Sequence, residues 1–129
     1  MFIIGLMTHS ILICRMSEER LQSEVVKYIM LQYPKVRFCA SLGGIYTGPR
    51  QAVKAKRTGY SRGYPDMFFS EARKGFHGLF IEIKTHKGRA TEVQKEWIEA
   101  LKERGYKAEI CKGLPAILEL IDWYFEKDK

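Results

Sequence analysis

The chain has 129 residues, 46% of them hydrophobic and 12% aromatic, which suits one domain with a packed core and excludes a disordered tail. Its formal net charge of +7 favours a polyanionic partner, although composition does not separate nucleic acid from an anionic membrane surface. Three cysteines without a CxxC pair argue against a zinc site and a disulfide framework, so we interpret Cys14, Cys39 and Cys111 as small buried hydrophobes in a reducing compartment.

The N-terminal stretch, MFIIGLMTHSILICR, is unusually apolar. Small and polar residues interrupt the run, which is also too short to span a membrane. It lacks the basic segment and the clear cleavage site of a strong signal peptide. We expect residues 1–15 to be an extension of unknown role, such as an added strand, a dimer contact or a segment upstream of a start at Met16. One domain then follows over residues 16–129.

The segment from Ser17 to Pro34 predicts an amphipathic helix. Ser17 is a favoured N-cap residue, acidic side chains crowd the first turn, where the helix dipole favours them, and Pro34 closes the segment. Residues 35–41 then predict a short strand. The apolar stripe of the helix is expected to consist of Leu21, Val25, Tyr28 and Ile29.

Residues 43–63 form a glycine-rich and cation-rich excursion between core elements, with room for a short helix over residues 51–56. Clustered cations on such a segment suit the phosphate backbone of a nucleic acid, while a solvated loop is the plain alternative. The cations expected to face nucleic acid are Arg50, Lys54, Lys56, Arg57 and Arg62.

The next segments predict a β-hairpin and a helix. Residues 64–71 and 78–84 are predicted to be strands, and the polar turn between them favours antiparallel pairing. Thr91 and Gln94 have the spacing of a capping box at a helix start, and Gly105 suits the residue just after that helix.

A further strand over residues 106–111 and an amphipathic helix over residues 114–129 complete the chain. The helix before the last strand would carry the chain across the sheet as a crossover connection. We interpret Trp97 and Trp123 as core residues. The order of elements predicts an α/β domain with a mixed central sheet flanked by helices.

Glu82 and Lys84 are charged residues inside an otherwise apolar strand, LFIEIK, where charge is expensive unless it is used or neutralised. Residues two apart point to the same side of a strand, so Ile81 and Ile83 face the core, and Glu82 and Lys84 face the other way together. Asp66 opens the preceding strand, and in a hairpin it comes close to both charges. The plain alternative is a solvated ion pair worth at most ~1 kcal/mol.

Two carboxylates and an ammonium at one strand pair suggest Mg²⁺ or Mn²⁺. Such ions take oxygen ligands from one or two carboxylates, from water and from substrate phosphate. The candidate ligands are Asp66, Glu82 and the backbone carbonyl of Ile83. Lys84 would orient or help deprotonate the attacking water, or stabilise charge that builds on the phosphate.

The motifs YPD and EIK, followed by a glutamine-and-tryptophan helix, EVQKEW, resemble the PD-(D/E)xK nuclease superfamily and, within it, the VRR-NUC family. The resemblance covers roughly Ser17 to Gly113. It includes GYPDMFF, GLFIEIK and a first helix that begins with acidic residues, EERLQ. It implies a restriction-endonuclease-like αβββαβ core. One departure is the family's Pro-Asn-Gly-like turn after the first strand. Here that stretch reads CASLGGIYTGPR, and the missing Asn bears on substrate preference more than on chemistry.

The resemblance implies a metal-dependent phosphodiesterase that acts on DNA. Asp66 and Glu82 would be metal ligands and Lys84 the catalytic lysine. Gln94, on the helix behind the site, would support the lysine or the water.

The resemblance also adds an acid on the first helix to the metal site. Glu18 matches it, with Glu19 and Glu24 as alternatives. Stand-alone family members resemble homodimers that cut branched DNA such as four-way junctions. We therefore expect a homodimer that acts on DNA, without an organic cofactor or a membrane partner, in the cytoplasm, or in the host cytoplasm or nucleus for a viral source. The alternatives are a non-catalytic nucleic-acid-binding module on the same fold and, more remotely, a membrane-surface protein.

Overall fold

The computed structural model describes residues 16–41 and 48–126. The apolar extension, with Cys14, therefore lies outside the described residues, as does part of the cation-rich excursion. No helix of the described ranges is long and apolar enough to cross a membrane.

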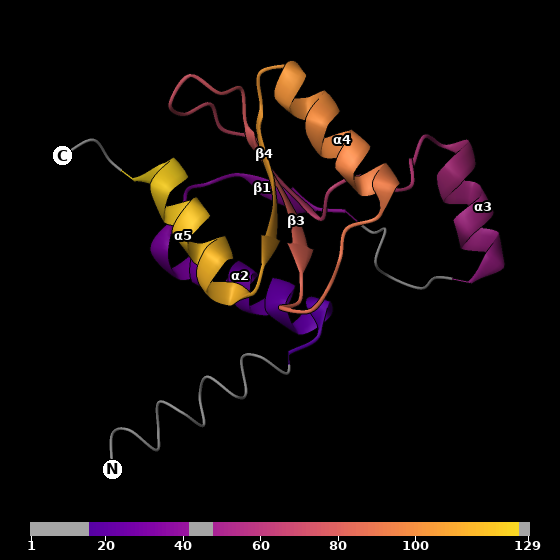
Figure 1. The fold of residues 1–129 in the computed structure, drawn as a ribbon, viewed down its shortest axis with the longest axis horizontal. Coiled ribbons are helices and arrows are strands. Elements are labelled where there is room, and N and C mark those ends of the chain that lie inside the picture. Colours follow the sequence, from indigo (N-terminus) through magenta and orange to yellow (C-terminus); the bar gives the residue numbers. More distant parts are fainter. Residues whose placement is uncertain (1–15, 42–47, 127–129) are drawn as a thin grey trace, which may run out of the picture. The chain divides into compact units, whose positions relative to one another are not determined.

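The order of elements follows the prediction, with one helix inserted between the first two strands (Figure 1). The inserted helix, α3, is longer than the short helix expected in the cation-rich excursion. The elements, in chain order, are α2 (Glu18–Gln32), β1 (Phe38–Ala40), α3 (Pro49–Arg57), β2 (Met67–Phe69), β3 (Leu79–Lys84), α4 (Glu92–Glu103), β4 (Lys107–Lys112) and α5 (Leu114–Phe125).

The strands form a mixed sheet in the order β1-β2-β3-β4. β1 pairs with β2 and β2 pairs with β3, both antiparallel, so the predicted hairpin is confirmed. β4 runs parallel to β3, because the hydrogen bonds from Lys107 N to the Gly78 carbonyl (2.9 Å) and from Gly113 N to the Lys84 carbonyl (3.0 Å) advance together along both strands. The connection between them contains α4, as expected of a crossover.

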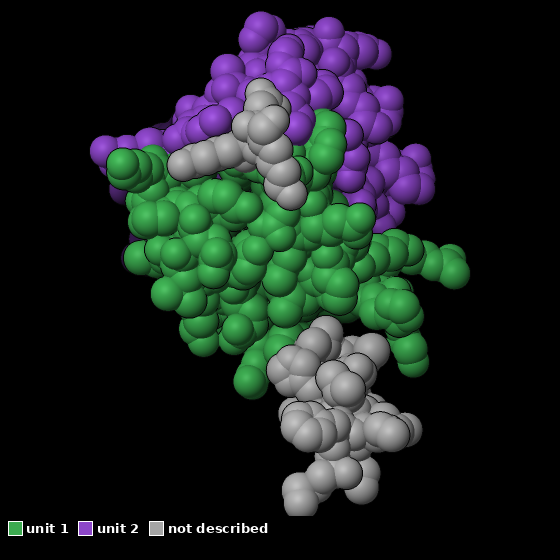
Figure 2. All heavy atoms as spheres, turned by 90° about the vertical axis from the view of Figure 1, so that its left-hand side faces the viewer, with its two compact units in different colours: residues 1–36, 83–89, 111–129 green, residues 37–82, 90–110 purple. Residues whose placement is uncertain are grey.

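The chain divides into two compact units, shown in green and purple in Figure 2. Unit 1 comprises residues 1–36, 83–89 and 111–129, and unit 2 comprises residues 37–82 and 90–110. The last two residues of β3 belong to unit 1, and the first four belong to unit 2. Each unit is described separately below.

In unit 1, α2 packs against α5. Leu21, Val25 and Ile29 are buried as predicted. Tyr28 is only half-buried, because its hydroxyl reaches the half-buried Asp122 on α5. Trp123 is 41% exposed, so its interpretation as a core residue is wrong. It lies next to Asp122 on α5, beside the buried positions of the helix.

In unit 2, α4 covers one face of the strands. Phe80 of β3 is buried with Ile98 and Leu101 of α4, and the Phe68 ring stacks on Phe80 at 4.3 Å between centroids. Trp97 packs against this cluster, in line with the prediction. The opposite face of the strands holds side chains with no exposed surface, namely Met67, Phe69, Leu79 and Ile81.

The cysteines differ in their surroundings. Cys111 is buried as expected, but Cys39 is exposed, so that interpretation is wrong for Cys39. Cys39 lies on β1, which is an edge strand of the sheet, and its partner across the strand pair is Phe68. An edge strand has no neighbour on its outer side to cover such a side chain.

Candidate active site

The hairpin register brings the two predicted carboxylates together. Met67 pairs with Ile81, so the register continued by one residue sets Asp66 opposite Glu82. In a regular antiparallel pair such opposite Cβ atoms lie roughly 5 Å apart and on the same face. The backbone before β2 is also fixed, because Pro65 is buried and the Asp66 carbonyl accepts a 2.8 Å hydrogen bond from Ser41 N.

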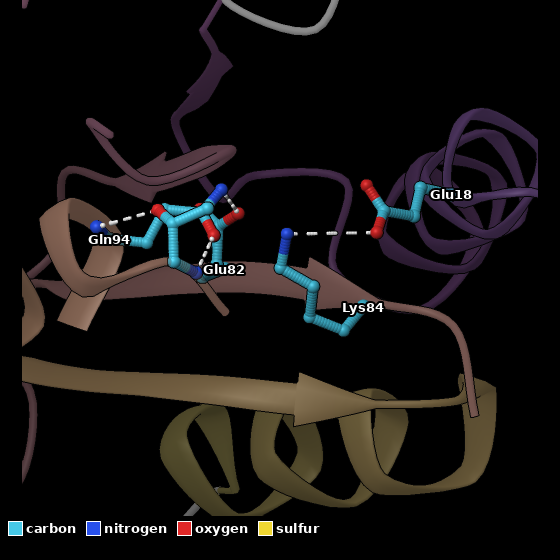
Figure 3. Close-up of polar contacts among 5 residues, drawn as sticks. Glu18, Glu82, Lys84 and Gln94 are labelled. Carbon is cyan, nitrogen blue, oxygen red and sulfur yellow. Dashed lines mark hydrogen bonds and ion pairs between the residues drawn. The ribbon is translucent and has the colours of Figure 1, made fainter. Parts of the chain in front are cut away.

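Glu82 is a buried carboxylate, with 2% of its surface exposed. A buried charge is costly unless hydrogen bonds or a counter-charge compensate it. The side-chain amide of Gln94 donates from Nε2 to Glu82 Oε1 over 2.8 Å (Figure 3). Gln94 therefore contacts the carboxylate itself, whereas the resemblance assigned its support to the lysine or the water.

The orientation of Gln94 is set by the start of α4. Thr91 is the N-cap residue, and its Oγ1 accepts from Gln94 N over 3.2 Å. In return, Gln94 Oε1 accepts from Thr91 N over 2.9 Å, which completes the predicted capping box. Since its oxygen is engaged with the cap, the amide nitrogen is directed to Glu82.

Lys84 is the second buried charge of β3, and its partner comes from the first turn of α2. Its Nζ lies 3.7 Å from Glu18 Oε1, an ion pair drawn in Figure 3. The side chain of Glu18 is 48% exposed, and that of Lys84 is 8% exposed. Ser17 fixes the helix start, because its Oγ accepts from Arg20 N over 3.2 Å.

The three acids proposed for the first helix differ in their ion-pair partners. Glu18 pairs with Lys84. Glu19 is exposed, and Glu24 pairs with Lys27 one turn further along the same helix, at 3.2 Å. Glu18 is therefore the acid of this helix that contacts a predicted catalytic side chain.

The cations expected to face nucleic acid are all exposed, and four of them lie on α3. None forms an ion pair with a described residue. In contrast, the lysines Lys27, Lys95 and Lys102 each pair with a glutamate three residues earlier on their own helix. The exposed and unneutralised cations are Arg50, Lys54, Lys56, Arg57 and Arg62.

The donor chemistry fits a hard cation better than zinc. Across residues 16–41 and 48–126, no three His, Cys, Asp or Glu side chains gather into a metal-binding group. Mg²⁺ and Mn²⁺ need less, because one or two carboxylates suffice when water and phosphate complete the coordination. The opposed Asp66 and Glu82 meet that requirement.

Ser41 is a polar neighbour of the site that the sequence prediction missed. The β1–β2 register, continued by one residue, sets it opposite Asp66, in one cross-strand row with Glu82. Its position two residues after Cys39 on β1 carries the signal, because alternate residues share a face. That signal is usable only once the register is known.

Comparisons with known proteins agree with this geometry. The model of the VRR-NUC domain family matches residues 8–115. A solved structure titled "VRR_NUC domain protein" is 35% identical in sequence and superposes with a TM-score of 0.74, over 86% of this chain and 89% of that chain. No curated protein gives a match. The predicted fold class is confirmed by this structural match.

Proposed function

Because the chain belongs to the VRR-NUC family of nucleases, we propose that it is a metal-dependent endonuclease that hydrolyses phosphodiester bonds in DNA. The observation that supports this most strongly is the environment of Glu82. This carboxylate is buried, stands opposite a second carboxylate across a strand pair, and is oriented by a 2.8 Å hydrogen bond from Gln94. A buried carboxylate destabilises a strand that has only a structural role, so its presence here favours a functional one.

Asp66 and Glu82, with the Ile83 carbonyl, would hold Mg²⁺ or Mn²⁺. When bound, the cation supplies Lewis-acid polarisation of a phosphoryl oxygen. The protein fixes the direction of its own ligand, because Gln94 locks one oxygen of Glu82 in place. Groups behind a metal ligand commonly control its orientation in this way.

Lys84 would act on the reacting phosphate. Glu82, Ile83 and Lys84 are consecutive residues of β3, so the ligands and the ammonium lie within one stretch of strand. The ammonium would orient the attacking water or stabilise charge that develops on the phosphate. Glu18 forms an ion pair with Lys84 that restrains the lysine side chain, and it is a further candidate ligand for the cation.

The cations of α3, with Arg62, would bind the DNA backbone. They are exposed and have no acidic partner among the described residues, so phosphate can take that place without breaking an ion pair. From the resemblance to stand-alone family members, we further propose a homodimer that cuts branched DNA such as four-way junctions.

The test is a cleavage panel with linear, nicked, flapped and four-way DNA in Mg²⁺ or Mn²⁺. We expect the four-way junction to be cut fastest, and Asp66→Ala and Lys84→Ala to abolish cutting. Light scattering should give the mass of two chains. If no substrate is cut by the wild type, yet DNA is bound and calorimetry shows no Mn²⁺ uptake that depends on Asp66, the protein is a binding module and the proposal is wrong.

A further inference from the structure

The basic helix α3 is not held in place by its own burial. No residue of α3 is buried, and its N-cap, Gly48, makes no side-chain capping bond. Its C-terminal bonds are local, since the Thr58 hydroxyl and amide both reach the Lys54 carbonyl. A helix of this kind needs an external anchor if its cations are to keep a fixed position.

One anchor is the backbone of Gly63, which lies against the first turn of α4. Gly63 has φ +88°, and a Cβ there would lie 2.6 Å from Val93 Cγ1 and 3.0 Å from the Val93 carbonyl carbon. Contacts this short exclude any side chain unless something shifts. The loop after α3 can therefore approach α4 this closely only because residue 63 is glycine.

The second anchor is Trp97, one turn further along α4. Its indole Nε1 donates to the Arg62 carbonyl over 3.2 Å. The ring of Tyr64 stands edge-on to Trp97, with 5.2 Å between centroids, and edge-on to Phe80 of β3, with 5.8 Å. Residues 62–64 thus contact both α4 and β3, the strand that carries Glu82.

The same part of α4 also orients Glu82. Val93 and Trp97, which hold the loop, flank Gln94, which holds the carboxylate. We propose that Gly63 and Trp97 are positioning residues that hold the cations of α3 for the DNA backbone at a fixed distance from the carboxylates. This deepens the proposed function and rests on it.

The anchor acts on α3 more than on Asp66. Asp66 has its own restraints, namely the buried Pro65 before it and the Ser41 bond to its carbonyl. Gln94, which orients Glu82, is held separately by its cap with Thr91. Loss of the anchor should therefore leave metal binding intact and weaken DNA binding, since a loose cationic helix must be ordered at each encounter.

Two variants release the anchor in different ways. Gly63→Ala introduces the clash with Val93. Trp97→Phe keeps a ring against Tyr64 but cannot donate to Arg62. Gly75→Ala is the matched control, because Gly75 has φ +85° with nothing within 4 Å of its Cβ position. It therefore carries the same backbone strain without a contact to α4.

The measurement is the affinity for duplex DNA as a function of salt, with Ca²⁺ in place of Mg²⁺ to slow cleavage. Each phosphate contact adds about 0.9 to the slope of log affinity against log salt. We expect Gly63→Ala to lower the slope by about two. Trp97→Phe should weaken DNA binding by about fivefold, because the hydrogen bond that holds Arg62 in place is lost. Mn²⁺ affinity, measured by calorimetry, should stay unchanged in both, and Gly75→Ala should resemble the wild type.

A double-mutant cycle shows whether the anchor acts through α3. In a background with Arg50→Gln, Lys54→Gln and Arg57→Gln, Gly63→Ala should cost little further affinity. Equal cost in both backgrounds, or an unchanged salt slope in both anchor variants, would overturn the inference. Failure of the proposed function looks different, because the wild type then cuts no DNA and shows no Mn²⁺ uptake that depends on Asp66, whatever the salt slope of its DNA binding.

Discussion

At the residue scale, Gln94 connects the folding of a helix to the chemistry of a carboxylate. Its side-chain oxygen caps α4 at Thr91, and its side-chain nitrogen bonds to Glu82. Both roles use one rigid amide group, so neither can shift without the other. Stability and activity are therefore coupled at this position, and a paired substitution can separate them.

We expect Gln94→Ala to slow cleavage about 10- to 100-fold, as is typical for groups that orient a metal ligand. Thr91→Ala is the control, because it removes the hydroxyl of the cap and leaves Gln94 facing Glu82. It should cost about 1 kcal/mol in the free energy of unfolding, with little change in rate. Single-turnover kinetics and urea unfolding measure the two effects. Equal rate losses in both variants would show that Gln94 serves only the helix.

Glu18 allows a second test among acids of the same helix. Glu18→Gln removes the charge that faces Lys84, and we expect about a 10-fold slower cleavage because the ammonium loses its partner. Glu19→Gln and Glu24→Gln are matched controls that should cut at the wild-type rate, since neither side chain has an ion pair with Lys84. A slower Glu19 or Glu24 variant beside a normal Glu18 variant would reassign the first-helix acid.

Sequence patterns predicted individual contacts only where spacing along the chain determines them. The capping box of Thr91 and Gln94 and the shared side of Glu82 and Lys84 follow from helical and strand periodicity. The bond between Gln94 and Glu82 did not follow, because it joins residues from two elements. The hydrogen bond from Trp97 to Arg62 could not be predicted from the sequence for the same reason.

At the element scale, α2 and α5 are joined by a cluster of two tyrosines and one carboxylate. Asp122 accepts from Tyr28 Oη at 2.7 and 2.8 Å and from Tyr33 Oη at 2.6 Å. Burial and the bond to Asp122 raise the pKa of Tyr33 well above its usual range. The bond to Asp122 and, next, burial raise the pKa of Tyr28. Both phenols therefore stay protonated up to a higher pH in the folded state than in the unfolded chain.

A raised tyrosine pKa stabilises the fold in a defined pH window. The stabilisation is complete below the ordinary tyrosine pKa of 10.0 and is lost as the pH rises from there toward the folded value, because the unfolded chain then releases protons that the folded state retains. We expect the free energy of unfolding to fall less above that pH in Tyr33→Phe than in the wild type. Urea unfolding between pH 8 and pH 11 measures this, and parallel curves for the two proteins would contradict it.

Element types were predictable from sequence, but their lengths were not. The strand expected over residues 64–71 is only Met67–Phe69, because Pro65 has no N–H to donate to a neighbouring strand. The expected helix 51–56 extends to Pro49–Arg57, since proline is tolerated in the first turn of a helix. Pairing and capping decide such limits, and both depend on partners distant in sequence.

At the scale of the whole molecule, the net charge is +7, and the cations that contribute to it differ in whether they form ion pairs. Lysines on α2 and α4 are partly neutralised by glutamates of the same helix, whereas the cations of α3 are not. Residues 50–62 therefore carry five cations that have no acidic partner among the described residues. Composition alone predicted a polyanionic partner, but only the ion pairs show which cations are available to it.

This distribution predicts unequal effects of charge removal on DNA binding. Neutralising Arg50, Lys54 and Arg57 together should lower the salt slope by about two to three, since each phosphate contact contributes about 0.9. Neutralising three paired lysines instead should change the slope by less than one. The control set, which removes the same number of charges, is Lys27, Lys95 and Lys102. Equal slopes in the two triple variants would mean that α3 has no special part in binding.

The central claim is that the buried Glu82 serves a metal-dependent cleavage reaction. The most direct measurement is single-turnover cleavage of a four-way DNA junction by the wild type and by Glu82→Gln, with Mg²⁺ titrated from a chelated start. The wild type should cut only when Mg²⁺ is present, and Glu82→Gln should be about 100-fold slower or worse at every Mg²⁺ concentration. Cleavage that persists with a chelator, or a Glu82→Gln variant that cuts at the wild-type rate, would contradict the claim.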